Sequence, residues 1–326
     1  MKVLFIGGTG NISTACSKLA VKKGIDLFHL NRGITKVEIE GVKTILGDIH
    51  KPETLSELKK HTWDVVVNWI AFVPEDIERD INLFKDKTKQ YIFISSASCY
   101  QKPLSHPVIT ESTPLKNNYW EYSNNKIKCE DLLMKAYRAF DFPVTIVRPS
   151  YTYDNVIPIA IGGFKEYTTA DRILKGKEII VHGDGTSLWA LTHADDFAVG
   201  FVGLLGLLKA VGHAFQITSD EILTWNTIYQ TLAHSLGCEA KMVHIASDLI
   251  CKIEPSYTGG LLGDKNESVI FDNTKIKTFV PEFKATIPFH EGIKRVLSWF
   301  DANPEMKVVN PETNAVIEKI LKVYKL

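Results

Sequence analysis

The chain has 326 residues, 45% of them hydrophobic and 23% charged, which is the composition of a globular protein with a sizeable core. The formal net charge is +0, so no overall basic field attracts the protein to nucleic acid or anionic lipid. The five cysteines are widely spaced and the histidines show no ligand spacing, which argues against a disulfide framework and a metal site. No apolar run is long enough for a signal peptide or a membrane helix, so we expect a cytoplasmic protein without a membrane partner.

Short apolar runs alternate with amphipathic stretches through the first two hundred residues. Several of these runs are apolar on both faces, as are the strands of a parallel sheet that helices cover on both sides. Their alternation with helical patterns predicts an α/β fold with a doubly wound parallel sheet of the Rossmann type. The strands are expected at residues 2–6, 26–30, 43–46, 64–70, 91–95 and 144–148.

The regular alternation ends near residue 150. Residues 194–211, "ADDFAVGFVGLLGLLKAV", predict a helix, and the later part of the chain mixes strands and helices without a repeat. We therefore expect an NAD(P)-binding Rossmann domain at residues 1–155, with a return segment at about 190–215. Residues 156–326 would form mainly a smaller, mixed substrate-binding lobe.

A glycine-rich loop, "GGTGNIS" at residues 7–13, joins the first strand to the first helix. Gly7 permits a tight turn, and Gly10 lets the backbone approach a pyrophosphate at the positive end of the helix. Ser13 stands where the third glycine of this pattern is usual, and serine is nearly as small. The position of the loop between a strand and a helix predicts dinucleotide binding rather than a merely structural turn.

The second strand ends in "LNRG", and this end bears on the choice of cofactor. An acidic residue here would bind the adenosine ribose and select NAD. Asn31 is neutral and the guanidinium of Arg32 suits a 2′-phosphate, so the sequence favours NADP over NAD. The alternative is that Arg32 only stacks on adenine or faces solvent.

Further motifs follow in order along the chain. "LGDI" follows the third strand, "NWIA" ends the fourth, "ISSASCY" ends the fifth and "VRPSYTYD" ends the sixth. Between the last two, Tyr122 and Lys126 lie four residues apart, so they share one face of a helix. This succession resembles the extended short-chain dehydrogenase/reductases, the NAD-dependent epimerases and dehydratases that act largely on sugar nucleotides. The resemblance covers residues 2–200.

The resemblance implies roles for individual residues. Ser96, Tyr122 and Lys126 would be the catalytic residues. The substrate would contact Ser98, Tyr151 and Trp189. NAD or NADP would contact Gly7, Gly10, Asn11, Ile12, Asn31, Arg32, Asp48, Ile49, Trp69, Ile70, Ala71, Tyr122 and Lys126.

The implied chemistry explains these residue types. A free phenol has a pKa of about 10 and is a poor base at neutral pH. A lysine ammonium one helical turn away and an oxidised nicotinamide would both lower the pKa of Tyr122. Tyr122 would then take a proton from a substrate hydroxyl while hydride leaves the same carbon for the nicotinamide, with Ser96 bound to the same oxygen. The alternative is a fortuitous pair on an ordinary helix.

Two departures from the family pattern bear on the substrate. Ala97 and Ser98 stand where the 4,6-dehydratases of the family carry an Asp-Glu pair, which argues against dehydration. Tyr151 and Trp189 stand where members that bind a nucleotide diphosphate carry asparagine and arginine. These residues indicate an aromatic pocket, so both a free sugar and a nucleotide sugar stay open as the substrate.

The expected activity is reversible hydride transfer at a secondary alcohol of a sugar or nucleotide sugar, by an epimerase or a reductase. The alternative is a non-catalytic NAD(P)-binding or RNA-binding protein on the same scaffold, such as the chloroplast stem-loop RNA-binding proteins. Those proteins have typically lost the Tyr-x-x-x-Lys pair, and the neutral charge disfavours nucleic acid as a partner. The usual homodimer of the family stays open, because only nineteen residues separate Ala71 from Tyr91 and shorten one helix of that interface.

Overall fold

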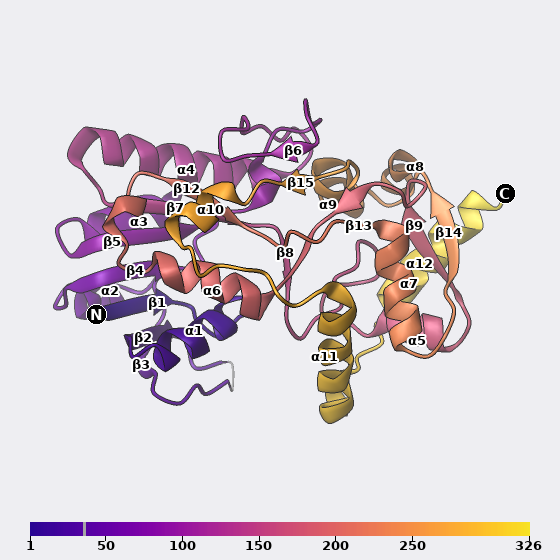
Figure 1. Ribbon diagram of the computed structural model, residues 1–326, viewed down its shortest axis with the longest axis horizontal. Helices are drawn as coiled ribbons and strands as arrows, with labels where there is room; N and C mark the ends of the chain where they lie inside the picture. The colour runs from indigo at the N-terminus through magenta and orange to yellow at the C-terminus, as the bar shows by residue number, and fades with distance from the viewer. Residues whose placement is uncertain (35–36) are drawn as a thin grey trace.

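The computed structural model describes residues 1–34 and 37–326, and its centre is a seven-stranded sheet in the order β12-β7-β5-β4-β1-β2-β3 (Figure 1). Every neighbouring pair of these strands is parallel. The predicted doubly wound α/β fold is therefore confirmed, and all six predicted strands are present. The strands are β1 (Lys2–Ile6), β2 (Asp26–Asn31), β3 (Lys43–Leu46), β4 (Trp63–Asn68), β5 (Thr88–Ile94), β7 (Val144–Pro149) and β12 (Ala214–Ile217).

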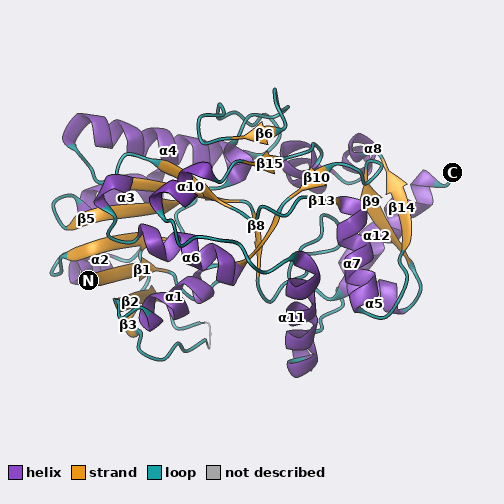
Figure 2. Ribbon diagram, in the orientation of Figure 1, coloured by secondary structure: helices purple, strands orange, loops and turns teal. Residues whose placement is uncertain are grey.

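Helices cover both faces of this sheet (Figure 2). The side chains of β1 alternate between the two layers, with Val3 and Phe5 on one side and Leu4 and Ile6 on the other. This burial on both sides is the reason that the strand is apolar throughout. The first layer holds α1 (Ser13–Lys22), α6 (Ala194–Leu204) and α10 (Thr274–Phe279), and the second holds α2 (Pro52–Leu58), α3 (Pro74–Phe84) and α4 (Glu121–Phe140).

The second lobe has a separate hydrophobic core around Trp189, Trp225 and Tyr229. A π-helical turn, Leu261–Lys265, follows α9 and is called the π-turn below. The helices of this part of the chain are α5 (Thr168–Leu174), α7 (Trp225–Ser235), α8 (Ser247–Ile253), α9 (Thr258–Gly260), α11 (Phe289–Ala302) and α12 (Pro311–Tyr324). Short 3-10 turns are formed by Ala97–Cys99, Leu208–Ala210, Pro255–Tyr257 and Pro304–Met306.

Small two-stranded pairings connect the remaining strands and join distant parts of the chain. Those of β6 with β15 and of β8 with β11 lie between the sheet and the second lobe (Figure 1). The others, β9 with β14 and β10 with β13, belong to the second lobe. These strands are β6 (Val108–Ile109), β8 (Tyr151–Tyr153), β9 (Glu178–His182), β10 (Leu188–Trp189), β11 (Leu191–His193), β13 (Leu223–Thr224), β14 (Lys241–Ile245) and β15 (Ile270–Phe271).

Two details differ from the sequence analysis. The helix predicted at 194–211 ends at Leu204, because Gly206 adopts a left-handed conformation with φ of 75° and the chain turns there. The Rossmann layers also include α10, whose Ile276 packs with α6, although residues 156–326 were assigned mainly to the second lobe. Within residues 1–34 and 37–326, no helix is long and apolar enough to span a bilayer.

Candidate active site

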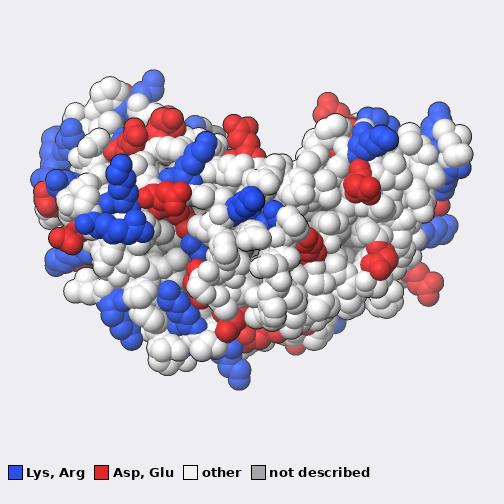
Figure 3. Space-filling view, turned by 90° about the horizontal axis from the view of Figure 1, so that it is seen from above, with Lys and Arg blue, Asp and Glu red and all other residues white. Residues whose placement is uncertain are grey.

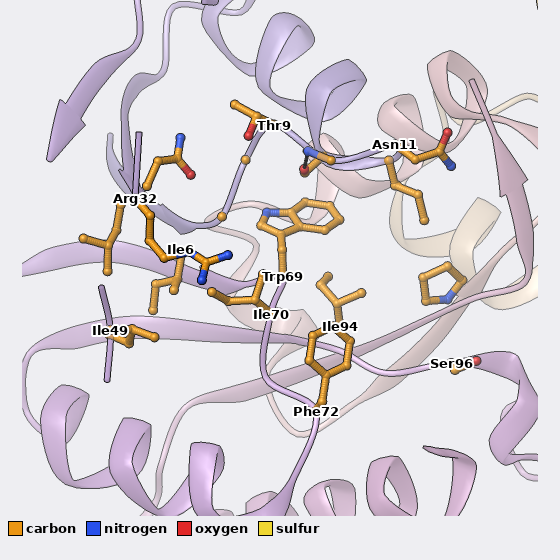
Figure 4. Close-up of a pocket in the computed structure, with 18 of the residues that line it drawn as sticks. Ile6, Thr9, Asn11, Arg32, Ile49, Trp69, Ile70, Phe72, Ile94 and Ser96 are labelled. Carbon is orange, nitrogen blue, oxygen red and sulfur yellow. Dashed lines mark hydrogen bonds between the residues drawn. The ribbon is translucent and has the colours of Figure 1, made fainter. Parts of the chain in front are cut away.

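A cleft of about 860 Å³ lies at the carboxyl ends of the sheet strands, in the loops that follow β1, β2, β3, β4, β5 and β7. This edge is where doubly wound sheets bind their ligands. In Figure 4, Arg32 and Ile49 lie at one end of the cleft, Ser96 lies at the other, and Trp69, Ile70 and Phe72 lie between them. Most predicted site residues line the cleft: Gly7, Gly10, Asn11, Ile12, Asn31, Arg32, Asp48, Ile49, Trp69, Ile70, Ser96, Tyr122, Lys126 and Tyr151.

The glycine loop, residues 7–13, forms a bare backbone surface in front of α1. Gly7 has φ of 78°, and a β-carbon there would lie 3.1 Å from the Ile70 side chain. The Gly10 N–H donates to Ser13 Oγ at 2.8 Å, so Ser13 secures the turn as well as being small. The first backbone N–H groups of a helix have no partner within the helix and attract anions. The loop therefore fits a pyrophosphate group.

Both polar atoms of the Asn11 side chain bond to a distant part of the chain. Its Nδ2 donates to Thr152 O at 2.9 Å, and its Oδ1 accepts from the Asp154 N–H at 3.1 Å. The side chain thus ties the glycine loop to β8 and the residue after it. Asn11 lines the cleft, but its polar atoms are used to hold two loops together.

A buried histidine, His29, is linked to the glycine loop through Ser17. Ser17 Oγ lies 3.1 Å from Gly8 O and 2.8 Å from His29 Nε2. A β-carbon at Gly8 would lie 2.5 Å from the same ring nitrogen, so only glycine fits there. Burial lowers the pKa of His29 to about 4, so the ring is neutral at neutral pH. This contact was not predicted from the sequence, because a histidine inside a strand carries no local signal of a contact with a loop.

Asn31, Arg32, Asp48 and Ile49 line the end of the cleft beyond β2 and β3. The His50 N–H donates to Asp48 Oδ1 at 3.0 Å. This bond, together with the nearby positive charges of His50 and Arg32, lowers the pKa of Asp48. The end of the cleft therefore holds one carboxylate and one guanidinium.

The loop after β4 crosses the middle of the cleft. Ile70 and Phe72 are 40% and 47% exposed on its wall, and apolar side chains exposed in a cleft indicate a ligand that covers them. Ala71 does not line the cleft, which corrects the prediction for this residue. Its side chain is buried, because its carbonyl oxygen turns toward α4 and accepts a hydrogen bond from Lys126.

Lys126 is 1% exposed and reaches the cleft from α4. Its Nζ donates to Ala71 O at 2.6 Å and to Ile94 O at 2.7 Å. The ammonium also lies 4.6 Å from the Phe72 ring centroid and 4.8 Å from that of Phe93. Burial lowers the pKa of Lys126 to about 8.

Tyr122 lies one turn before Lys126, and the centre of its ring is 5.8 Å from Lys126 Nζ. The pKa of Tyr122 is raised to about 12, chiefly by burial and then by Cys99, while the Ser96 side chain opposes the rise. The lowering expected from Lys126 is not present in the protein itself, because Lys126 has a pKa of about 8 and is neutral at the higher pH where this phenol titrates. The phenol is therefore protonated at neutral pH.

Ser96 and Ser98 are paired across the turn after β5. Ser96 Oγ lies 2.8 Å from Ser98 Oγ, and Ser123 Oγ donates to Ser98 Oγ at 2.7 Å. Ser96 lines the cleft, whereas Ser98 is buried behind it and is not on the surface that a substrate would meet. This placement corrects the substrate role predicted for Ser98.

One wall of the cleft is aromatic, and only one of the two aromatic residues predicted to contact the substrate lies there. Tyr151 lines the cleft, stacks on Phe164 at 5.6 Å and donates its hydroxyl to Ile159 O at 2.6 Å. Trp189 is 1% exposed, packs on Trp225 in the core of the second lobe and does not line the cleft. The prediction that Trp189 contacts the substrate is therefore wrong, because β10 directs this side chain inward.

Several lining residues were missed by sequence reasoning. Phe72 directly follows the "NWIA" motif, so its position beside the strand end was a usable signal. His50 directly follows the "LGDI" motif in the same way. Phe164 and Lys165 come from a loop of the second lobe, and no local pattern shows that this loop folds back onto the cleft.

Comparison with known proteins agrees with this geometry. The model of the family described as "NAD dependent epimerase/dehydratase family" matches residues 3–217. The chain belongs to this family. The resemblance stated from the sequence motifs is confirmed.

Two curated relatives of the family differ in what their names say they do. The chloroplast stem-loop binding protein of 41 kDa b of Arabidopsis thaliana is 26% identical over 260 residues, which is 74% of this chain and 65% of that protein. The chain thus spans just under two thirds of that relative. The UDP-glucose 4-epimerase of Lactobacillus helveticus is 23% identical over 350 residues, which is 94% of this chain and 98% of that protein.

Solved structures of the family have the same fold. The epimerase Mth375 from Methanothermobacter thermautotrophicus matches with a TM-score of 0.77 and 16% identity, over 94% of this chain and 93% of that one. The UDP-glucuronic acid 4-epimerase from Bacillus cereus, in complex with NAD, matches with a TM-score of 0.73 and 17% identity. That match covers 96% of this chain and 100% of that one.

Proposed function

We propose that the protein is an NAD(P)-dependent epimerase or reductase that carries out reversible hydride transfer at a secondary alcohol of a sugar or nucleotide sugar. One observation carries the proposal. Ser96, Tyr122 and Lys126 reach one end of a cleft that runs to the glycine loop and to Arg32. The family match and the epimerases among the relatives support the same chemistry.

Tyr122 would move the proton. Its protonated phenol can donate to a carbonyl oxygen in the reducing direction and recover the proton in the oxidising direction. Ser96 would bind the same substrate oxygen. Lys126 uses two of its three ammonium N–H groups on Ala71 and Ile94, which leaves one for a ligand. When bound, an oxidised nicotinamide would accept the hydride and add positive charge beside the phenol.

The cofactor would be NADP in preference to NAD. Asn31 has no charge to repel a 2′-phosphate, and Arg32 lines the same end of the cleft and could pair with it. Asp48 at that end has a lowered pKa and stays ionised, so it is the group that opposes NADP. Michaelis constants for the two cofactors test this choice. A tenfold or greater preference for NAD would contradict it.

The reaction would be epimerisation or simple reduction rather than 4,6-dehydration. Ala97 and Ser98 cannot supply the acid and base of a dehydratase, and neither lines the cleft. The UDP-glucose and UDP-glucuronic acid epimerases among the relatives make nucleotide sugars the first compounds to assay. Tyr151 and Phe164 provide an aromatic wall that a sugar ring can pack against.

The decisive experiment compares Tyr122→Phe with Tyr119→Phe. Tyr119 lies three residues earlier, is 42% exposed and does not line the cleft, so it is a matched control. UDP-glucose, UDP-glucuronic acid and the corresponding free sugars would be assayed with both cofactors. We expect Tyr122→Phe to lose at least about 1000-fold in kcat with cofactor affinity unchanged, and Tyr119→Phe to keep wild-type activity. An active Tyr122→Phe enzyme would end the proposal.

The match to the stem-loop binding protein favours a second candidate, an RNA-binding protein on the same scaffold. A gel-shift titration with a stem-loop RNA at several salt concentrations tests it. An RNA-binding protein would show an affinity that falls steeply with salt, because it releases counterions from the phosphates. Absence of binding at low salt, together with hydride transfer, would reject this candidate.

A further inference from the structure

Asn117 lies five residues before Tyr122, and its side chain joins three segments of the chain. It is 1% exposed. Its Nδ2 donates to Ser98 O at 2.8 Å and to Gly263 O at 2.7 Å. Its Oδ1 accepts from the N–H groups of Tyr119 at 3.0 Å and Trp120 at 3.1 Å. An amide side chain offers two donors and two acceptor positions, so Asn117 is fully satisfied and held in one orientation.

The first of these bonds leads to the catalytic serine. Asn117 holds the backbone of Ser98, whose hydroxyl is paired with Ser96 Oγ at 2.8 Å. Ser98 also accepts from Ser123 Oγ at 2.7 Å, and Ser123 is the neighbour of Tyr122 on α4. The distance between the Ser96 and Tyr122 hydroxyls therefore depends on where Ser98 is held.

The second bond leads to the second lobe. Gly263 belongs to the π-turn, and a β-carbon there would lie 3.1 Å from Asn117 Oδ1 and 3.2 Å from Trp120 Cβ. A β-carbon at Gly259 would lie 2.4 Å from the Trp120 ring. The centre of that ring is 5.0 Å from the centre of the Tyr122 ring. The π-turn and α9 thus pack closely on the residues that begin α4.

We propose that Asn117 is a positioning residue for proton transfer, because it holds the second lobe, the Ser96 turn and the Tyr122 helix in one fixed arrangement. The inference rests on the proposed function. Asn117 does not line the cleft, so it acts through Ser96 and Tyr122 rather than by touching the substrate. A displacement of about 1 Å in a catalytic group can cost about 100-fold in rate.

Asn117→Ala removes all four hydrogen bonds, and Asn118→Ala is the matched control. Asn118 is exposed, and none of the hydrogen bonds described for this region involves its side chain. We expect Asn117→Ala to lower kcat about 100-fold and to change the Kd for NAD less than about threefold. Asn118→Ala should match the wild type in both. Because Asn117→Ala can also impair folding, Gly263→Ala is the second variant. Its added methyl group presses on Asn117 Oδ1 and should give a smaller fall in kcat.

The pH titration of the Tyr122 phenol distinguishes two roles for Asn117: positioning Ser96 and Tyr122, or only stabilising the fold. The tyrosinate absorbance of each NAD-bound protein, minus that of the same protein carrying Tyr122→Phe, reports this one phenol. The groups that face it are Ser96 and Cys99 from the turn after β5, Lys126 from α4 and Asp264 from the π-turn. Ser96 is the group that lowers the pKa of Tyr122, so its displacement should move the midpoint to higher pH.

Two outcomes would overturn the inference. One is a lower melting temperature in Asn117→Ala and Gly263→Ala with kcat and the Tyr122 midpoint both unchanged, which would make Asn117 a purely structural residue. The other is an equal loss in Asn118→Ala. If the wild type transfers no hydride, the proposed function fails, and the Tyr122 midpoint still decides the role of Asn117.

Discussion

At the scale of single residues, burial is the main influence on the ionisable groups Tyr122 and Lys126 at one end of the cleft. It lowers the pKa of Lys126 to about 8 and raises the pKa of Tyr122 to about 12. Both shifts favour the neutral form of the side chain. The site therefore holds a phenol that keeps its proton and an ammonium that gives its proton up more easily than a lysine in water.

The shift at Lys126 makes a prediction about stability and pH. Its pKa is about 8 in the folded protein and about 10.4 when unfolded, so between these values the unfolded chain binds one more proton. Stability from this group therefore rises with pH across that window, by roughly 3 kcal/mol in all. Urea unfolding at several pH values gives the free energy of unfolding of the wild type and of Lys126→Met. The difference between these two free energies isolates Lys126, because the other titrating groups are the same in both proteins. If this difference in unfolding free energy did not change with pH, the pKa of Lys126 would not be lowered by folding.

The end of β2 makes a prediction about cofactor choice. Asn31→Asp places a carboxylate where it can accept from a ribose hydroxyl and repel a 2′-phosphate. The ratio of kcat/KM for NADP to that for NAD should fall at least about tenfold, since a charge contact of this kind contributes more than 1.4 kcal/mol. Arg32→Ala is the comparison, and it should weaken NADP without strengthening NAD. An unchanged ratio in both variants would mean that this end of the cleft does not select the cofactor.

Residues whose placement depends only on their neighbours along the chain were predictable from the sequence. Gly7 and Gly10 follow a strand directly, and Tyr122 and Lys126 are one helical turn apart, so their placement in the cleft follows from chain geometry. Trp189 was not predictable in this way. Its direction depends on the core of a lobe built from distant segments.

At the scale of elements, a buried polar network holds the loop after β4. Asp80 on α3 accepts from the hydroxyl of Tyr91 at 2.6 Å, from the amide of Asn68 and from two nitrogens of Arg79. Asn68 in turn accepts the Ile70 N–H at 2.9 Å. The position of the cleft wall is therefore set by a carboxylate that never reaches the cleft.

Asp80→Ala should be strongly destabilising. The change leaves Tyr91 and Asn68 buried without their shared acceptor, and it removes one of the two carboxylates that pair with the half-buried Arg79, which keeps Asp76. Breaking a buried pair on one side costs roughly 3–5 kcal/mol. Glu78→Ala on the exposed side of α3 is the control and should stay within about 0.5 kcal/mol of the wild type. Denaturant unfolding checks both. Equal stability of the two variants would contradict the role of Asp80 in holding this network.

A second buried contact, that of His29 on β2 with Ser17 and Gly8, fixes the glycine loop against β2. Gly8→Ala adds a methyl group 2.5 Å from the buried ring, so the loop must lift and the affinity for NAD should fall at least about tenfold. Gly260→Ala, whose methyl group would meet no atom within 4 Å, should bind NAD normally. The double variant Gly8→Ala with His29→Ala has room for the methyl group and should recover part of the affinity. Fluorescence titration with NAD measures all three.

At the scale of the whole molecule, the sheet was predictable and the arrangement of the second lobe was not. Six of the seven strands of the sheet lie within the first 150 residues and each has a strong apolar pattern, whereas the seventh, β12, comes from residues 214–217 and was not predicted. The second lobe is joined to the sheet by pairings such as β6 with β15, whose strands are more than 150 residues apart. No local pattern specifies such a pairing, and it brings α10 back onto the Rossmann layers.

Charge at this scale favours the enzyme over the RNA-binding alternative. The net charge is +0, and on the face shown in Figure 3 basic and acidic side chains are interspersed. Nucleic-acid affinity depends largely on a basic surface that neutralises phosphates. The charge pattern on this face therefore gives no support to a nucleic-acid partner.

In the proposed mechanism, Tyr122 moves a proton while hydride passes between a sugar carbon and a nicotinamide bound in this cleft. The most direct measurement follows deuterium from the carbinol carbon of a labelled sugar nucleotide to the cofactor in a single turnover, in the wild type and in Tyr122→Phe. We expect label in the reduced cofactor of the wild type and none above background in Tyr122→Phe, with both proteins binding NAD equally. Transfer at the same rate in both proteins would contradict it.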